Sequence, residues 1–120
     1  MSNIVNIEDV PKQPGLKIAH KLMDQQVLGP EGGTHAITGA EKTYIIVQTY
    51  EPGGSHDSHA HEDSEQAFLV LSGEGQMHIG GKVYPIKKGS VAYAPPNVEH
   101  STENTGSEPL VMMLIGVKLD

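Results

Sequence analysis

Glycine and proline interrupt the chain at short intervals, and this limits the secondary structure that it can form. From residue 52 onward one or both recur about every ten residues, which would break any long helix. Between them lie short segments rich in β-branched and aromatic residues, among them TYIIVQTY (43–50) and AFLVLSG (67–73). Within residues 75–86, Gly80 and Gly81 separate two alternating runs, which is typical of a two-residue hairpin. The pattern predicts short, regularly spaced strands and therefore an all-β sandwich or barrel.

The C-terminal part continues this pattern of short strands. GSVAYAPP (89–96) predicts a strand that proline ends, and VEHSTENTG (98–106) and LVMMLIGVKL (110–119) complete the chain. Alternate residues of a strand face opposite sides of a sheet. The last segment is apolar on both faces, so we expect one face to line the interior and the other to pack against an outer layer or a partner chain.

The N-terminal part carries weaker signals. LKIAHKLM (16–23) predicts a strand, and residues 25–42 predict a loop or a weak hairpin. At 120 residues the chain has the size of one domain. We expect residues 43–120 to form the barrel core, and residues 1–42 to add strands and loops that pack on the barrel or on a partner chain.

Composition excludes several classes of function. The formal charge is −7, and the eight basic residues are scattered lysines with no arginine among them. We therefore expect no binding of nucleic acid or of an anionic membrane surface, since both need a clustered basic face. Without cysteine, disulfides and thiolate metal sites are impossible. The N-terminus lacks the features of a secretory signal, and the most apolar stretch, 109–117, is too short to span a bilayer, so we expect a cytoplasmic protein.

The segment GGSHDSHAHEDSEQ (53–66) concentrates three histidines and four acidic residues just before a hydrophobic strand. In a strand, residues i and i+2 face the same side, so His59 and His61 are expected to project together. Glu65 follows four positions after His61, and a bend can bring its carboxylate to the same centre. Imidazole and carboxylate ligands suit a divalent transition metal. Taken alone, the His-x-His pattern also fits a solvated loop with incidental histidines.

This segment and a second one, GSVAYAPPNVEHSTEN (89–104), together resemble the paired motifs of the cupin superfamily. The first family pattern is Gly, five residues, His-x-His, three or four residues, Glu, about six residues and Gly. The second is Gly, five residues, Pro-x-Gly, two residues, His, three residues and Asn. The first motif matches here at Gly53, His59, His61, Glu65 and Gly73, with seven residues in the last gap. The second matches at Gly89, Pro95, His100 and Asn104, with Asn97 where glycine is usual.

The resemblance implies a double-stranded β-helix, the jelly-roll barrel of the cupins. It also implies that His59, His61, Glu65 and His100 bind one divalent transition metal per chain, namely Fe, Mn, Zn or Ni. Asn97 departs from the pattern only mildly, because asparagine tolerates positive φ better than most residues. Small cupins commonly form homodimers, so we expect a homodimer.

Two polar residues flank these ligands. His56 lies an odd number of positions before His59 and is interpreted as a rim residue that faces away, with an additional metal ligand as the alternative. Gln66 neighbours Glu65 and is expected to point the opposite way, making a hydrogen bond on the exterior of the barrel.

Strand parity leaves a second choice open in the segment 43–50. Gln48 and Tyr50 share one face of this strand, while Ile45 and Val47 share the other. If the first face is inward, Gln48 and Tyr50 are the polar groups nearest to the metal. If it is outward, the two aliphatic residues line the pocket instead.

The absence of arginine also narrows the range of substrates, because no bidentate clamp on a carboxylate or phosphate is possible. We expect a small neutral or metal-chelating molecule, such as an enol, a catechol-like compound or a ketone. One hypothesis is a metal-dependent enzyme, of the dioxygenase, isomerase or lyase type, in which Glu65 is a ligand and a possible proton acceptor. The alternative is a non-catalytic module that binds a small ligand or a metal, and a third hypothesis is a cupin that binds no metal.

Overall fold

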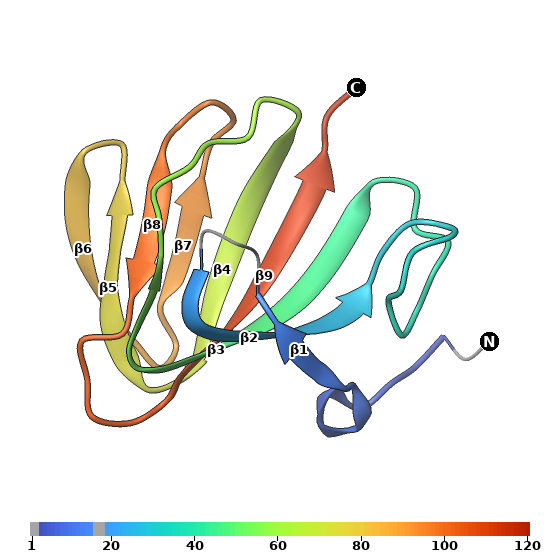
Figure 1. Cartoon of the computed structure of the whole chain (residues 1–120). Coiled ribbons are helices and arrows are strands. Elements are labelled where there is room, and N and C mark those ends of the chain that lie inside the picture. Colours follow the sequence, from blue (N-terminus) through green and yellow to red (C-terminus); the bar gives the residue numbers. More distant parts are fainter. Residues whose placement is uncertain (1–2, 16–18) are drawn as a thin grey trace.

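The chain folds into a curled antiparallel sheet in a computed structural model that describes residues 3–15 and 19–120 (Figure 1). This confirms the all-β prediction, since a single short 3-10 helix is the only helical element among these residues. The elements are η1 (Ile7–Asp9), β1 (Lys12–Pro14), β2 (Ala19–Leu28), β3 (Thr43–His56), β4 (Ser64–Ser72), β5 (Glu74–Ile79), β6 (Lys82–Lys87), β7 (Val91–Ala94), β8 (His100–Glu103) and β9 (Leu110–Lys118).

The strands follow the order β6-β5-β8-β3-β9-β4-β7, with β2 on β3 and β1 on β2. Figure 1 shows β6, β5 and β8 curled toward the strands that continue from β3, so that the sheet forms a half-barrel. The strand predicted for 16–23 is observed from Ala19 onward, and residues 16–18 lie outside the described residues. Among the described residues, no helix has the length and the apolar character that crossing a membrane requires.

β3 joins the two halves of the sheet because it bends near its end. It pairs with β9 from Thr43 to Tyr50 but with β8 only at Ser55. At the bend, Gly53 has a φ of 81°, a conformation that favours glycine. A Cβ on Gly54 would lie 2.8 Å from two backbone carbonyl oxygens, so this position also has no room for a side chain. The bend directs the chain toward the segment that carries the histidine motif.

The two faces of the sheet bury different apolar clusters. The inner face holds the main core, and strand parity therefore places the even-numbered residues of β3, β4 and β9 inward. The outer face carries a smaller cluster beneath the N-terminal segment, in which Val10, Val27 and Val47 are buried. The inner core consists of Leu22, Tyr50, Phe68, Val70, Met77, Ile86, Ala94, Leu110, Met112 and Leu114.

Two motif residues have structural roles. Asn97 has a φ of 65°, so it adopts the positive φ expected where glycine is usual. Asn104 is buried and donates from its side chain to the carbonyls of Tyr50 and Glu108, while it accepts from the amide of Gly106. These bonds anchor the turn after β8 to β3 just before its bend.

Candidate metal centre

Three histidines from the two motifs converge at one point. His59 and His61 lie in the segment between β3 and β4, and His100 begins β8. One ligand nitrogen from each lies within 4.8 Å of the others, which is close enough for a shared metal ion. A backbone bridge draws the segments together, with the His59 amide 3.1 Å from the His100 carbonyl and the reverse bond 2.9 Å long. The structure thus brings together three of the four predicted ligands.

Backbone carbonyls orient two of the rings. Nδ1 of His59 lies 3.1 Å from the Asp57 carbonyl, and Nδ1 of His100 lies 3.1 Å from the Val98 carbonyl. A carbonyl oxygen only accepts, so each Nδ1 carries the proton and donates it. This tautomer leaves the Nε2 lone pair of each ring free to bind a metal, an arrangement that is general among metal-binding histidines.

Gln66 supplies a fourth potential ligand atom. Its Oε1 lies 3.1 Å from Nε2 of His100, and the side chain is buried. With the His100 proton on Nδ1, both atoms of this contact carry lone pairs, so the contact is not a hydrogen bond. Two ligands on one ion, each about 2.1 Å from it, lie roughly 3 Å apart, and the observed distance therefore suits neighbouring metal ligands.

Tyr44 fixes the orientation of the Gln66 amide. Gln66 Nε2 donates to the Tyr44 hydroxyl at 2.9 Å, and this hydroxyl lies 3.2 Å from Ser64 Oγ. Because the amide nitrogen is held by Tyr44, Oε1 must face His100. The Tyr44 ring lies over Gly116 on β9, where a Cβ would overlap it. Glycine at 116 is therefore needed for the position of Tyr44 and, through it, of Gln66.

The structure does not bring Glu65 to the histidines. Glu65 and Gln66 lie on opposite faces of β4, and the inward residue is Gln66, contrary to the prediction that it faces outward. On the outer face, the Glu65 carboxylate accepts a 3.0 Å hydrogen bond from the Tyr93 hydroxyl. One signal in the sequence points to Gln66. Four residues separate it from His61 and six separate it from Gly73, so both gaps of the family pattern fit at this position.

His56 lies inside the site and not on the rim where the sequence places it. It is 7% exposed, its ring centroid lies 4.8 Å from that of His59, and its Nδ1 lies 3.0 Å from the Asp57 carbonyl. The prediction failed because β3 ends at His56, and the chain then turns, so the alternation of a regular strand no longer applies. His56 is nevertheless outside the group of three whose nitrogens converge.

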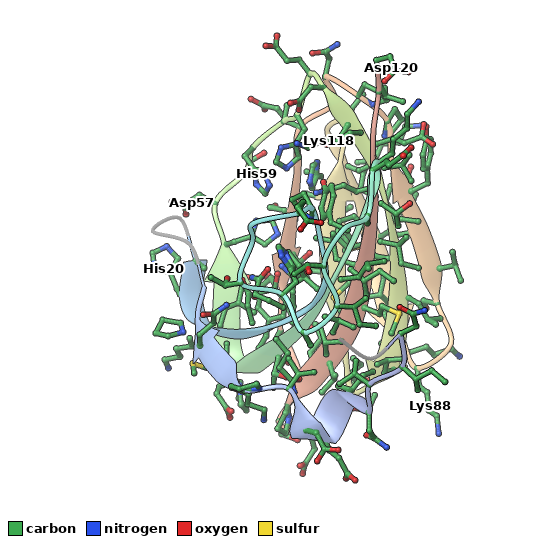
Figure 2. The ribbon with its side chains drawn as sticks, turned by 90° about the vertical axis from the view of Figure 1, so that its right-hand side faces the viewer. His20, Asp57, His59, Lys88, Lys118 and Asp120 are labelled. Carbon is green, nitrogen blue, oxygen red and sulfur yellow. The ribbon has the colours of Figure 1, made fainter. Side chains whose placement is uncertain are left out.

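The converging nitrogens face a cavity of about 180 Å³ between β2, β3, β4 and β8. Gln48 lines it and Val47 does not, so the face of β3 with Gln48 and Tyr50 is the inward one. In Figure 2, His59 lies beside the exposed His20–Asp57 pair, on the opposite side of the molecule from Lys88. The lining residues are Ala19, Leu22, Asp24, Gln26, Tyr44, Ile46, Gln48, His56, His59, His61, Gln66, Phe68, His100 and Leu114.

Asp24 on β2 is the one carboxylate among the described residues that line this cavity, and no pattern in the sequence pointed to it. It is 6% exposed, and its Oδ1 has no hydrogen-bond partner among the described residues. Burial raises the pKa of Asp24 from 3.8 to about 6 because the charged form loses solvation.

The site is chemically suited to a divalent metal. Burial lowers the pKa of His100 to about 4 and also lowers that of His61, so both imidazoles are neutral near pH 7. Neutral imidazole is the form that binds Zn, Fe, Ni and similar ions. Three imidazoles and one amide oxygen have the right donor atoms and spacing for such an ion.

Known proteins resemble the chain in sequence and fold. The family model described as "Cupin domain" matches residues 46–116. An oxalate-binding protein of Thermotoga maritima is 38% identical over 68 residues, which cover 57% of this chain and 56% of that relative. The chain thus spans only about half the length of this curated relative.

Solved structures share the fold over the whole chain. A structure described as a predicted oxalate decarboxylase from Thermotoga maritima superposes with a TM-score of 0.80 at 22% identity, covering 97% of this chain and 99% of that one. An RmlC-like cupin from Shewanella frigidimarina has a TM-score of 0.73 at 17% identity, with 100% and 93% covered. At these identities the likeness shows the fold alone.

The substitution Tyr44→Phe tests the support of Gln66. The ring and its packing against Gly116 remain, but the acceptor for the Gln66 amide is lost. We expect the affinity for Ni²⁺ or Zn²⁺ to fall about 10- to 100-fold, the usual effect of losing an outer partner of a metal ligand. Competition titration with a chelator measures it. Tyr84→Phe, on an exposed tyrosine of β6, is the matched control, and equal affinities in both variants would contradict the role of Tyr44.

Asp24→Asn tests the cost of the buried carboxylate. A raised pKa means that ionising Asp24 destabilises the fold, fully above about pH 6 and not at all well below pH 4. We therefore expect the variant, freed of metal with EDTA, to be more stable than the wild type by about 1–3 kcal/mol at pH 8. This advantage shrinks as the pH falls from 6 toward 4. Urea unfolding measures it, with exposed Glu51→Gln as the control, and a destabilised variant at pH 8 would refute it.

Proposed function

We propose that this chain, which belongs to the cupin family, binds one divalent transition metal and uses it to hold a small oxygen-chelating molecule. The ligands in this proposal are His59, His61 and His100, with Gln66 as the fourth. The observation that carries it is the convergence of three imidazole nitrogens, two of them oriented by backbone carbonyls, at the wall of a cavity.

The charge of the ligand set favours oxygen donors. Three neutral imidazoles and a neutral amide leave the full double charge of the ion directed toward the cavity, whereas a glutamate ligand would halve it. When bound, a metal in this position supplies Lewis-acid activation of a ketone, enol or enolate oxygen. The cavity is partly lined by Ile46, Phe68 and Leu114, which exclude water from a ligand held there and strengthen its electrostatic contacts.

We place neutral chelators, such as hydroxyketones, enols and catechols, ahead of dicarboxylates. The Thermotoga relative is named for oxalate, but none of the described residues lining this cavity is a lysine, and the sequence has no arginine. A second carboxylate would therefore find no basic partner and would face Asp24. The reaction in this proposal is of the isomerase, lyase or dioxygenase type. Glu65 takes no part in it, because its carboxylate is bonded to Tyr93 outside the cavity.

A non-catalytic binding module remains the alternative to an enzyme, since the cupin fold hosts both. The two differ in what happens to a bound chelator. A module returns it unchanged, whereas an enzyme alters it over many turnovers, and mass spectrometry of the recovered ligand separates the two.

Metal content tests the first part of the proposal. The protein, purified without a histidine tag, is expected to contain about one equivalent of Fe, Mn, Zn or Ni per chain by elemental mass spectrometry. The double variant His59→Ala/His100→Ala is expected to contain none, because two of three imidazole ligands are removed. A wild-type protein that takes up no metal even after reconstitution would rule out the site.

A matched pair of neighbouring substitutions identifies the fourth ligand. Gln66→Leu removes the inward oxygen and is expected to lower metal affinity at least about tenfold, while Glu65→Gln on the outer face leaves it unchanged. The reverse result would restore Glu65 as the ligand.

We also propose that the chain forms a homodimer through the outer face of β7, β4, β9 and β3. Strand register aligns apolar side chains into two rows that cross all four strands. Within residues 3–15 and 19–120, the N-terminal segment that packs near Val47 is the one layer on this face. At the β7 end, Val91 is 74% and Tyr93 52% exposed. The rows are Val91–Leu69–Met113–Val47 and Tyr93–Ala67–Ile115–Ile45. A continuous apolar patch of this kind favours a self-complementary contact.

A charge in the centre of this face tests the dimer. Leu69→Lys is expected to shift the protein from a dimer to a monomer in light scattering at micromolar concentration, because the ammonium would be buried without a partner. Val83→Lys places the same charge at an exposed position of β6, outside this face, and this variant is expected to remain a dimer. A monomeric wild-type protein would refute the interface.

A further inference from the structure

A second polar group lies in the cavity, away from the converging histidines. Asp24 on β2 and Gln48 on β3 are direct cross-strand partners, and both side chains line the cavity. Directly opposed residues on paired strands have Cβ atoms about 5 Å apart, so the two side chains lie next to each other. They come from the N-terminal part of the chain and from the strand before the first motif, and neither belongs to the cupin motifs.

Both side chains present a buried oxygen without a partner. Asp24 is 6% and Gln48 is 8% exposed, and among the described residues neither Asp24 Oδ1 nor Gln48 Oε1 has a hydrogen-bond partner. Leaving a buried acceptor unsatisfied costs about 1–3 kcal/mol, and more when the group is charged. By contrast, Gln66 in the same cavity is oriented by the bond from its Nε2 to Tyr44, and its Oε1 lies beside His100 in the position proposed for a metal ligand.

No neighbouring group in the described part of the chain is hydrogen-bonded to these two oxygens. Leu22 and Gln26 flank Asp24 on the same face of β2, and Ile46 and Tyr50 flank Gln48 on the same face of β3. The Tyr50 hydroxyl is likewise buried without a hydrogen-bond partner among the described residues, and burial together with the charge of Asp24 raises its pKa. A hydroxyl group of a ligand in the cavity can therefore supply the hydrogen bonds that Asp24 Oδ1 and Gln48 Oε1 lack.

We propose that Asp24 and Gln48 form a second subsite, which accepts hydrogen bonds from a hydroxyl group at the end of the ligand opposite its chelating oxygens. This inference rests on the proposed function, because it assumes that the other end is held at the metal centre. It defines the substrate class more narrowly: a small molecule with a hydroxyketone, enol or catechol at one end and a free hydroxyl at the other. A second acidic end is excluded by the carboxylate of Asp24.

The size of the cavity agrees with this class. A cavity of about 150 Å³ is sufficient for benzene in another protein, and this one is about 180 Å³. One six-membered ring with short substituents therefore fits between the two polar ends, against the apolar walls formed by Phe68 and Leu114.

A pair of matched chelators tests the subsite. Kojic acid and allomaltol are hydroxypyranones with the same chelating oxygens, and they differ only in that kojic acid carries a hydroxyl on the substituent across the ring. Binding of each to the Ni²⁺-loaded protein is measured by calorimetry. We expect kojic acid to bind about tenfold more tightly than allomaltol, because its hydroxyl donates to a charged acceptor that is otherwise unsatisfied.

Substitutions at the subsite are expected to remove this preference without affecting chelation. In Asp24→Asn the ratio is expected to fall to about twofold, since a neutral acceptor gives a weaker bond, and Gln48→Leu is expected to reduce it as well. Allomaltol affinity stays unchanged in both variants. Glu51→Gln, which removes one exposed carboxylate from the same strand as Gln48, retains the full ratio.

The possible failures are distinguishable. If the wild-type protein binds both pyranones equally, or if the preference survives in Asp24→Asn and Gln48→Leu, the subsite is refuted while the proposed metal function stands. If neither pyranone binds to the metal-loaded protein, the proposed function fails and the subsite fails with it.

Discussion

Two backbone hydrogen bonds between His59 and His100 hold the candidate metal centre together. They join a segment without regular strand structure to the first residue of β8, across a separation of some forty residues in sequence. Because the main chain makes this connection, the side chains are free to point at the cavity, and further carbonyls of Asp57 and Val98 orient two of the rings. The geometry of the site is therefore set by the backbone before any metal contributes.

The polar side chains that line the cavity differ in whether they have hydrogen-bond partners within the protein. Gln66 Nε2 is held by Tyr44, and Tyr44 in turn has its place because residue 116 is glycine, so the Gln66 oxygen is fixed beside His100. Asp24 Oδ1 and Gln48 Oε1 belong to side chains that line the same cavity, and neither oxygen has a hydrogen-bond partner among the described residues, at a cost in stability. The first arrangement supports Gln66 as the fourth ligand in the proposed function, and the second supports the proposed subsite.

Much of the fold follows from local patterns. The local pattern predicts the first part of β3, and the spacing of glycine and proline predicts the strands from β4 to β9, because each of these is short and bounded by a turn. The order of the two motifs predicts the family and the three histidines that converge, because a metal site needs specific residues at specific separations. The extension of β3 beyond Tyr50 was not predicted, because Pro52, Gly53 and Gly54 are residues that usually end a strand. Here they form the bend that connects the two halves of the sheet.

The sequence by itself determined the all-β fold class, the cupin family and the convergence of His59, His61 and His100. Only the tertiary structure decided which residues face inward. β4 is apolar on both faces, so its alternation does not distinguish Gln66 from Glu65, and the choice depends on how the chain turns between His56 and Ser64. The position of Asp24 depends on the pairing of β2 with β3. The orientation of Gln66 and the position of Asp24 both depend on contacts between residues that are far apart in the chain. Local sequence patterns do not contain this information.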